Sequence, residues 1–132
     1  MTFSAISLVS FVAGLGSGLI GGVFFAFSSF VLPALARLPG PQGLVAMQSI
    51  NRVVLNRSFL GAFLGTGALC GWLVVDALAH GSGLRAGFRL LGAGLYLIGS
   101  LLVTKRLNVP YNDALAAVAP DADGASRVWA EF

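Results

Sequence analysis

The most prominent pattern in the chain is a long run of uncharged, mainly apolar residues from Thr2 to Ala36. About 20 apolar residues cross the hydrocarbon core of a bilayer, so this run predicts a membrane-spanning helix over residues 4–32. Small residues recur at every fourth position on one helical face, at Ser10, Gly14, Gly18, Gly22 and Ala26. Small residues let helices approach closely in lipid, so we expect this face to seat the other spans.

Two more apolar runs predict further spans, over residues 58–79 and 88–107. Between the first two spans, the proline-rich break at residues 38–41 is followed by a segment with apolar residues on one side, residues 42–55. This segment is too short to span and carries Arg52 near its end. We therefore predict an amphipathic helix that lies at the membrane interface.

Composition supports the same class of protein. The chain has 132 residues, of which 57% are hydrophobic and only 10% are charged. These fractions predict one all-α domain over residues 1–132, an integral membrane bundle with the lipid bilayer as its surroundings. The net charge of +3 comes from scattered basic residues without a basic stripe, which argues against a nucleic-acid partner.

The distribution of basic residues predicts the orientation in the cell (inner) membrane. Two arginines, Arg85 and Arg89, flank the loop between the second and third spans. The opposite side carries six basic residues: Arg37, Arg52, Arg57, Lys105, Arg106 and Arg127. Because basic residues favour the cytoplasm, we expect the amino terminus outside and the carboxyl-terminal segment inside.

Few residues suggest chemistry within the spans. One cysteine and one histidine, Cys70 and His80, lie far apart in the sequence and predict no metal site. We interpret Cys70 as a packing residue and His80 as a solvated loop residue. Asp76 lies about one turn from the end of the second span, where a structural role at the interface is expected.

Uncharged polar residues gather on one predicted membrane face. A single pair of spans separates two polar segments, one with Gln48, Asn51 and Asn56 and the other with Asn108, Asn112 and Asp113. Both segments must therefore lie on the same side of the membrane. Pro110 predicts the start of a new short helix, capped by Asn108 or a neighbour.

Three stretches carry a resemblance to a known family: residues 22–30, 47–56 and 108–115. They are similar to bacterial membrane proteins grouped with fungal anthrone oxygenases. The resemblance implies a small four-helix membrane bundle, and the fungal relatives oxidise anthrones to anthraquinones with O₂ and without metal or flavin. Members usually continue into a fourth span, whereas this sequence stops at Phe132. We therefore expect a shortened chain or a partner helix from a second copy or another protein.

Two classes of function follow from these patterns. An oxygenase needs a base and preorganised hydrogen-bond donors around an aromatic small molecule. The candidate catalytic residues are Asn108, Asn112 and Asp113, with Asp113 as the base, and the candidate substrate-binding residues are Phe24, Phe27, Gln48, Asn51 and Asn56. The alternative is a non-enzymatic accessory or assembly subunit, in which the asparagines cap helix ends. A transporter is the weakest reading, because no charge lies at mid-depth in any span.

Overall fold

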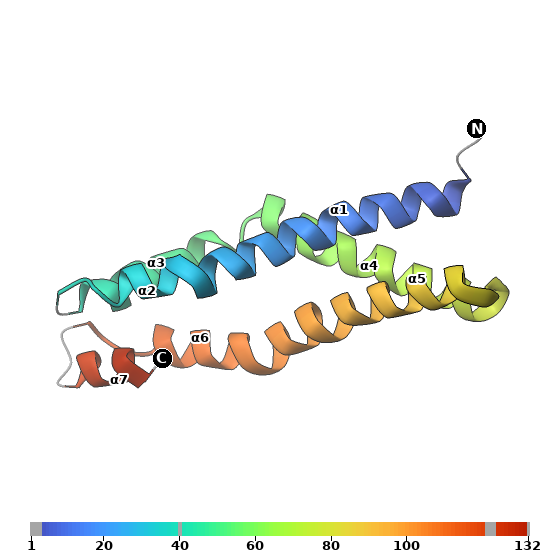
Figure 1. The fold of residues 1–132 in the computed structure, drawn as a ribbon. Helices are drawn as coiled ribbons and strands as arrows, with labels where there is room; N and C mark the ends of the chain where they lie inside the picture. Colours follow the sequence, from blue (N-terminus) through green and yellow to red (C-terminus); the bar gives the residue numbers. More distant parts are fainter. Residues whose placement is uncertain (1–3, 40, 121–123, 132) are drawn as a thin grey trace. The chain divides into compact units, whose positions relative to one another are not determined.

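The computed structural model describes residues 4–39, 41–120 and 124–131, and within these ranges the chain is helical and contains no strand (Figure 1). The elements in chain order are α1 (Ala5–Ala26), η1 (Phe27–Val31), α2 (Leu32–Leu35), α3 (Gln42–Val53), α4 (Arg57–His80), α5 (Gly83–Tyr96), η2 (Leu97–Leu102), η3 (Thr104–Asn108), α6 (Val109–Ala116) and α7 (Ala125–Glu131). The three segments labelled η are π-helical.

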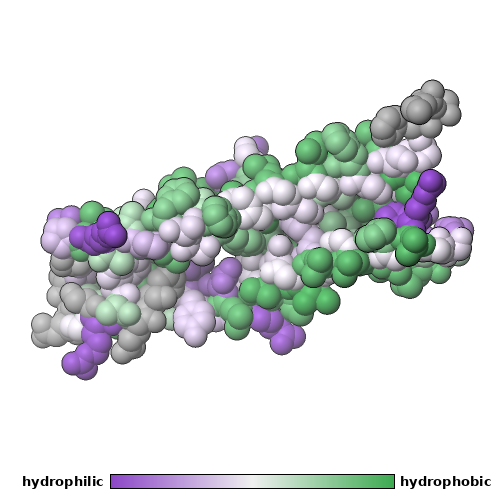
Figure 2. Space-filling model, viewed as in Figure 1, coloured by the Kyte–Doolittle hydropathy of each residue, from purple (hydrophilic) through white to green (hydrophobic). Residues whose placement is uncertain are grey.

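Among the described residues, three helices are long and apolar enough to cross a membrane, which confirms the predicted all-helical fold with three such helices: Ala5–Leu35, Arg57–His80 and Gly83–Ala116. Their apolar residues are mostly uncovered by the protein itself. Exposed apolar side chains line α5, for example, and are green in Figure 2. Such long apolar surfaces are stable in lipid and unfavourable in water.

The first of these helices continues through Pro33, by way of the π-helical segment η1. Proline lacks an N–H group and crowds the carbonyl four residues earlier, and a wider helical turn relieves that crowding. Ser28 donates its hydroxyl to the carbonyl of Phe24 at 3.0 Å, and Ser29 donates to the carbonyl of Phe25. Both serine hydroxyls are therefore hydrogen-bonded within their own helix, as a polar side chain in an apolar span requires.

The third long helix also continues, through Pro110, and here the sequence prediction of a new capped helix is wrong. Asn108 has helical backbone angles, φ −66° and ψ −43°, and its side chain makes no capping hydrogen bond. The π-helical segment η3 directly precedes α6 and accommodates the proline ring within the helix. A residue inside a continuous helix has no free N–H groups ahead of it to cap.

The chain forms two compact units, which are described separately: unit 1 is Met1–Gly22 with Arg57–Val103, and unit 2 is Val23–Asn56 with Thr104–Phe132. In unit 1, α4 and α5 pack against each other as a hairpin. The Tyr96 hydroxyl donates to the carbonyl of Phe63 at 2.8 Å, and both side chains are buried. Cys70 is also buried, as expected for a packing residue.

Asp76 and Arg89 join the same two helices. Arg89 Nη1 lies 2.7 Å from Asp76 Oδ2, and His80 Nδ1 lies 3.6 Å from the other carboxylate oxygen. The ion pair gives Asp76 the structural role that the sequence suggested, with a partner from the next helix. Its position beside the α4–α5 loop matches the charged end of a span.

The contact face of α1 differs from the predicted one. No described atom lies within 4 Å of a Cβ built on Gly14, Gly18 or Gly22, so this small-residue face seats no other part of unit 1. Gly16 instead lies against α4, where a Cβ would overlap the hydroxyl of Thr66. The four-residue spacing identifies a face that can be approached closely, but it cannot show whether a helix of the same chain uses it.

We expect Gly16→Val to destabilise unit 1 by about 1–3 kcal/mol, because the new side chain must displace Thr66. Gly18→Val is the matched control, since it makes the same change in the same helix where nothing is near. Thermal unfolding of both variants in detergent measures the difference. Equal unfolding temperatures for the two variants would contradict this packing.

In unit 2, α3 packs with α2, α6 and α7. Its predicted apolar face is confirmed, because Leu44 and Met47 are buried while Ser49 and Arg52 are exposed. The core joins residues from three helices: Leu44, Met47, Leu115 and Ala125. The apolar face of α3 is therefore covered by protein.

Candidate functional site

All eight residues that the sequence nominated lie in unit 2. They come from the end of α1, from η1 and α3, from the turn after α3, and from η3 and α6: Phe24, Phe27, Gln48, Asn51, Asn56, Asn108, Asn112 and Asp113. The packing of α3 on α6 decides which of these residues share a surface.

Gln48 fixes the position of α3 along α6. Its side-chain nitrogen donates to the carbonyls of Leu115 and Val118, at 2.8 Å and 2.9 Å. Carbonyl groups at a helix end lack hydrogen-bond donors in their own helix, so Gln48 provides donors for the carbonyls at the end of α6. Because both amide hydrogens are used, only the amide oxygen remains for a ligand.

Asn51 lies one turn beyond Gln48 on α3. The chain direction along α3 is opposite to that along α6 (Figure 1), so one turn forward on α3 corresponds to one turn back from Leu115. One turn back from the carbonyls of Leu115 and Val118 covers residues 111–115, so Asn51 faces this turn of α6. Its Nδ2 atom is buried and has no hydrogen-bond partner among the described residues.

An unpaired buried amide is costly. Leaving a buried donor unsatisfied typically costs about 1–3 kcal/mol, and native proteins contain few such groups. A cost of this kind is tolerated where the group serves a ligand rather than the fold. The Asn51 amide is thus a donor held ready in a protected position.

Two further asparagines lie on the side of α6 that contains the buried Leu115. Asn112 precedes Leu115 by three residues and Asn108 precedes it by seven, which places both near the same helical face. Asn112 is half-buried, whereas Asn108 is exposed. Asn112 thus lies in the turn of α6 that Asn51 faces, and Asn108 lies one turn earlier along the helix.

Asp113 is separated from this group. It is exposed, and its position two residues before Leu115 places it about 160° around the helix from that buried side chain. A carboxylate there cannot reach the side of α6 that faces α3. Direct contact between Asp113 and a molecule beside Asn51 is not supported by this arrangement.

Asn56 caps the carboxyl-terminal end of α3. It is exposed, and its Nδ2 atom donates to the carbonyl of Val53 at 2.9 Å. This bond is the capping role that the sequence analysis offered as the alternative to substrate binding. The Nδ2 atom of Asn51 makes no such bond in the part of the chain that the structure describes.

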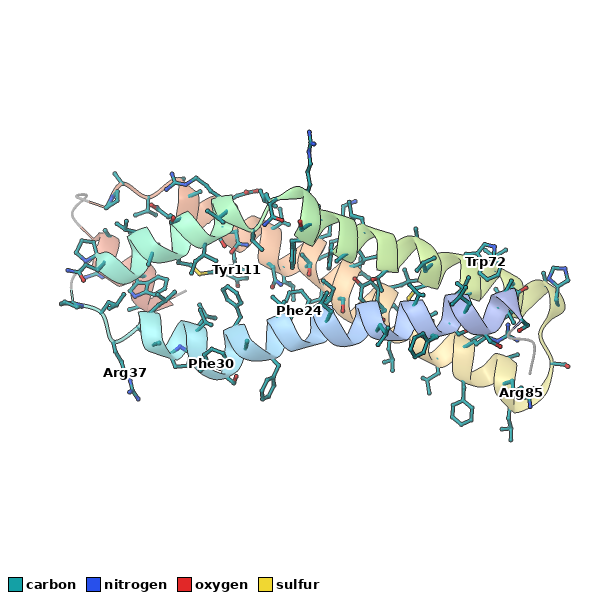
Figure 3. The ribbon with its side chains drawn as sticks, turned by 90° about the horizontal axis from the view of Figure 1, so that it is seen from above. Phe24, Phe30, Arg37, Trp72, Arg85 and Tyr111 are labelled. Atoms are coloured by element: carbon teal, nitrogen blue, oxygen red, sulfur yellow. The ribbon has the colours of Figure 1, made fainter. Side chains whose placement is uncertain are left out.

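The aromatic candidates also differ. Phe27 packs against the core around Leu44, and Phe24 is half-buried. In Figure 3, Arg37 projects outward after α2. Tyr111 is 61% exposed and belongs to α6, and the sequence analysis did not select it.

The chain matches the sequence model of one protein family. The sequence model described as anthrone oxygenase matches residues 53–132, which is more than half of the chain. The chain belongs to this anthrone oxygenase family. No curated protein and no solved structure matches the chain significantly.

The segment matched to the anthrone oxygenase family contains the α6 residues Asn108, Asn112 and Asp113. It does not contain Asn51, so the structure rather than the family match links Asn51 to α6. Within the described residues, no group of three or more His, Cys, Asp or Glu side chains could hold a metal ion.

Sequence reasoning missed one further residue of this family member, Thr104. Its Oγ1 atom is buried and is, with Asn51 Nδ2, one of two such side-chain atoms without a partner in the described chain. Thr104 precedes Asn108 by four residues and Asn112 by eight. This spacing was a usable signal, because residues four apart share a helical face.

Proposed function

We propose that this protein oxidises a hydroxylated aromatic compound of the anthrone type with O₂, using no metal or organic cofactor. Family membership supports the chemistry, and the unpaired Asn51 amide is the observation that carries the proposal. An amide N–H held in a protected position is suited to an oxygen atom that gains negative charge during a reaction.

The reaction begins with loss of a proton from the ring carbon between the two aromatic rings of an anthrone. The electron pair left behind spreads onto the ketone oxygen, which becomes an oxyanion. In this proposal Asn51 donates to that oxygen, and Asn112, from the turn of α6 that Asn51 faces, adds a second hydrogen bond. Both interactions are stronger to the anion than to the neutral ketone, so they favour the deprotonated form.

The carbanion then reduces O₂, and a carbon–oxygen bond forms to give a hydroperoxide. Loss of water breaks the oxygen–oxygen bond and the remaining carbon–hydrogen bond, which leaves a second ketone. One anthrone and one O₂ therefore give one anthraquinone and one water. The protein contributes proton removal, orientation and charge stabilisation.

We assign Asp113 as the proton acceptor that acts through water. Among the side chains described in unit 2 it is the only carboxylate, but it lies on the exposed face of α6. A base that lacks direct contact can act through a chain of waters, and the position of Asp113 on the exposed face of α6 requires such a chain here. Asp113→Asn should therefore slow the reaction less than loss of the Asn51 amide.

The proposed setting is the inner membrane, with the amino terminus outside and unit 2 towards the cytoplasm. The long apolar helices support a bilayer environment, and the predicted orientation rests on the basic residues counted above. Fused aromatic substrates dissolve in lipid, so a site in a small membrane bundle would meet them at high local concentration.

The direct test is the rate of anthraquinone formation from anthrone by membranes that contain the protein. The expected result is an initial rate well above that of matched membranes without the protein, and no product when O₂ is removed. The uncatalysed oxidation of anthrone sets the background, so both samples are measured at the same lipid content. A rate equal to that of the empty membranes would sink the oxygenase proposal.

The accessory-subunit alternative is favoured by one observation. The face of α1 that contains Gly14, Gly18 and Gly22 is uncovered, and small residues allow close approach of another helix. A homo-oligomer or a partner helix would use such a face. Cross-linking from Gly18→Cys distinguishes it, because an accessory role predicts a defined cross-linked product together with no anthrone oxidation.

A further inference from the structure

The Thr104 hydroxyl is a second buried group without a hydrogen-bond partner among the described residues. Within a helix, a threonine hydroxyl ordinarily donates to the carbonyl three or four residues earlier. Thr104 Oγ1 makes no such bond in the described structure, although the atom is buried. Burying an unpaired hydroxyl is unfavourable.

The π-helical backbone does not by itself explain this exception. Ser28 and Ser29 lie in the π-helical segment η1, and both of their hydroxyls donate to carbonyls of the preceding turn. Thr104 lies in the π-helical segment η3 and does not. Hydroxyls in a π-helical segment that follows an α-helix can therefore make this bond, and Thr104, which follows the π-helical segment η2, does not make it.

Thr104 is aligned with the asparagines of α6. Residues 104, 108 and 112 are four apart, and Asn112 lies in the turn of α6 that Asn51 faces. These three residues form a row along the helix. Its first member, Thr104, has a buried unpaired Oγ1 atom, and its last member, Asn112, lies in the turn that faces the buried unpaired Nδ2 atom of Asn51 on α3. An extended molecule along this row would meet a polar group near each end.

We propose that Thr104 binds an oxygen substituent of the substrate and selects fused-ring aromatics that carry oxygen at two separated positions. This inference rests on the proposed oxygenase function and adds a specificity-determining residue to it. Asn51 can donate its amide hydrogens to a ketone or its oxyanion, whereas a threonine hydroxyl both donates and accepts. The Thr104 end therefore suits a phenolic hydroxyl, and the Asn51 end suits the ketone that becomes charged.

The test uses Thr104→Val, which keeps the shape and removes the hydroxyl, and Thr104→Ser, which keeps the hydroxyl. Binding of a dihydroxyanthraquinone and of unsubstituted anthraquinone to the purified protein is measured by absorbance titration, where no turnover occurs. We expect Thr104→Val to raise the Kd of the dihydroxy compound about tenfold and leave that of anthraquinone unchanged. Thr104→Ser should retain most of the preference.

A second readout separates this role from a structural one. Without ligand, Thr104→Val should unfold at the same or a higher temperature than the wild type, because no hydrogen bond is lost. A lower unfolding temperature, or an equal effect on both quinones, would overturn the inference. Selective binding without anthrone oxidation would refute the oxygenase, whereas oxidation with no effect of Thr104→Val on binding would refute only the role of Thr104.

Discussion

Replacing Asn51 with leucine is expected to lower the rate of anthrone oxidation by about 10²–10³-fold, the loss typical of removing one preorganised donor from an oxyanion site. The same change should leave the folded protein at least as stable as the wild type. Asn51 Nδ2 is buried without a partner, so its removal breaks no hydrogen bond made by that atom. Loss of activity combined with retained stability is the pattern that a binding group predicts and a structural group does not.

Initial rates and thermal unfolding of the same preparations check this result. Ser49→Leu is the matched control, because Ser49 is exposed on α3 two residues earlier and makes the helix similarly more apolar. That control should oxidise anthrone at the wild-type rate. The proposal fails if Asn51→Leu is fully active, or if it loses stability in proportion to activity.

The second large effect concerns the core that holds α3 and α6 together. Leu44 is 0% exposed and packs with Met47 and Leu115. Leu44→Ala should lower the free energy of unfolding by about 2–5 kcal/mol, because it removes buried methyl groups and leaves a cavity. Anthrone oxidation should fall with it, since the register of Asn51 on α6 depends on this packing.

Val45→Ala provides the comparison for Leu44→Ala. Val45 is the next residue on α3 and is 44% exposed, so its truncation should change stability by less than about 1 kcal/mol. Chemical denaturation of the two variants in the same detergent measures the difference. Similar losses for both would show that α3 does not pack on the core through Leu44.

The features of the fold that depend on composition and periodicity were predictable from the sequence. Long apolar runs predicted three helices, and the spacing of Leu44 and Met47 predicted the buried face of α3. These predictions depend only on side-chain polarity along a regular helix. The covering of α3 by α6 and α7 depends on contacts between distant segments, and no local pattern encodes it.

Other features required the structure because two local arrangements were compatible with the same residues. Proline can end a helix or be accommodated by a wider helical turn. Pro110 is accommodated within a continuous helix, so Asn108 has no free N–H groups to cap. Glycine can mark a contact or an open face. On α1, Gly16 makes the contact and Gly14 does not.

In the candidate site, too, the sequence predicted the location of the polar residues but not their individual roles. The sequence located the amide-rich segments, because chain topology brings them to one end of the bundle. It could not separate their roles, since Gln48 is held by backbone carbonyls, Asn56 caps α3 and Asn51 has a free buried donor atom. Asp113 differs from Asn112 by one position, and that single step places it on the other side of α6.

The most direct measurement of the central claim is the fate of isotopically labelled O₂ during anthrone oxidation by the purified protein. Mass spectrometry of the anthraquinone and a peroxide assay are run at protein concentrations where the catalysed rate exceeds the background. The account predicts one labelled oxygen atom per quinone formed, one O₂ consumed and no accumulation of hydrogen peroxide. A quinone without label, with one hydrogen peroxide released per turnover, would contradict it.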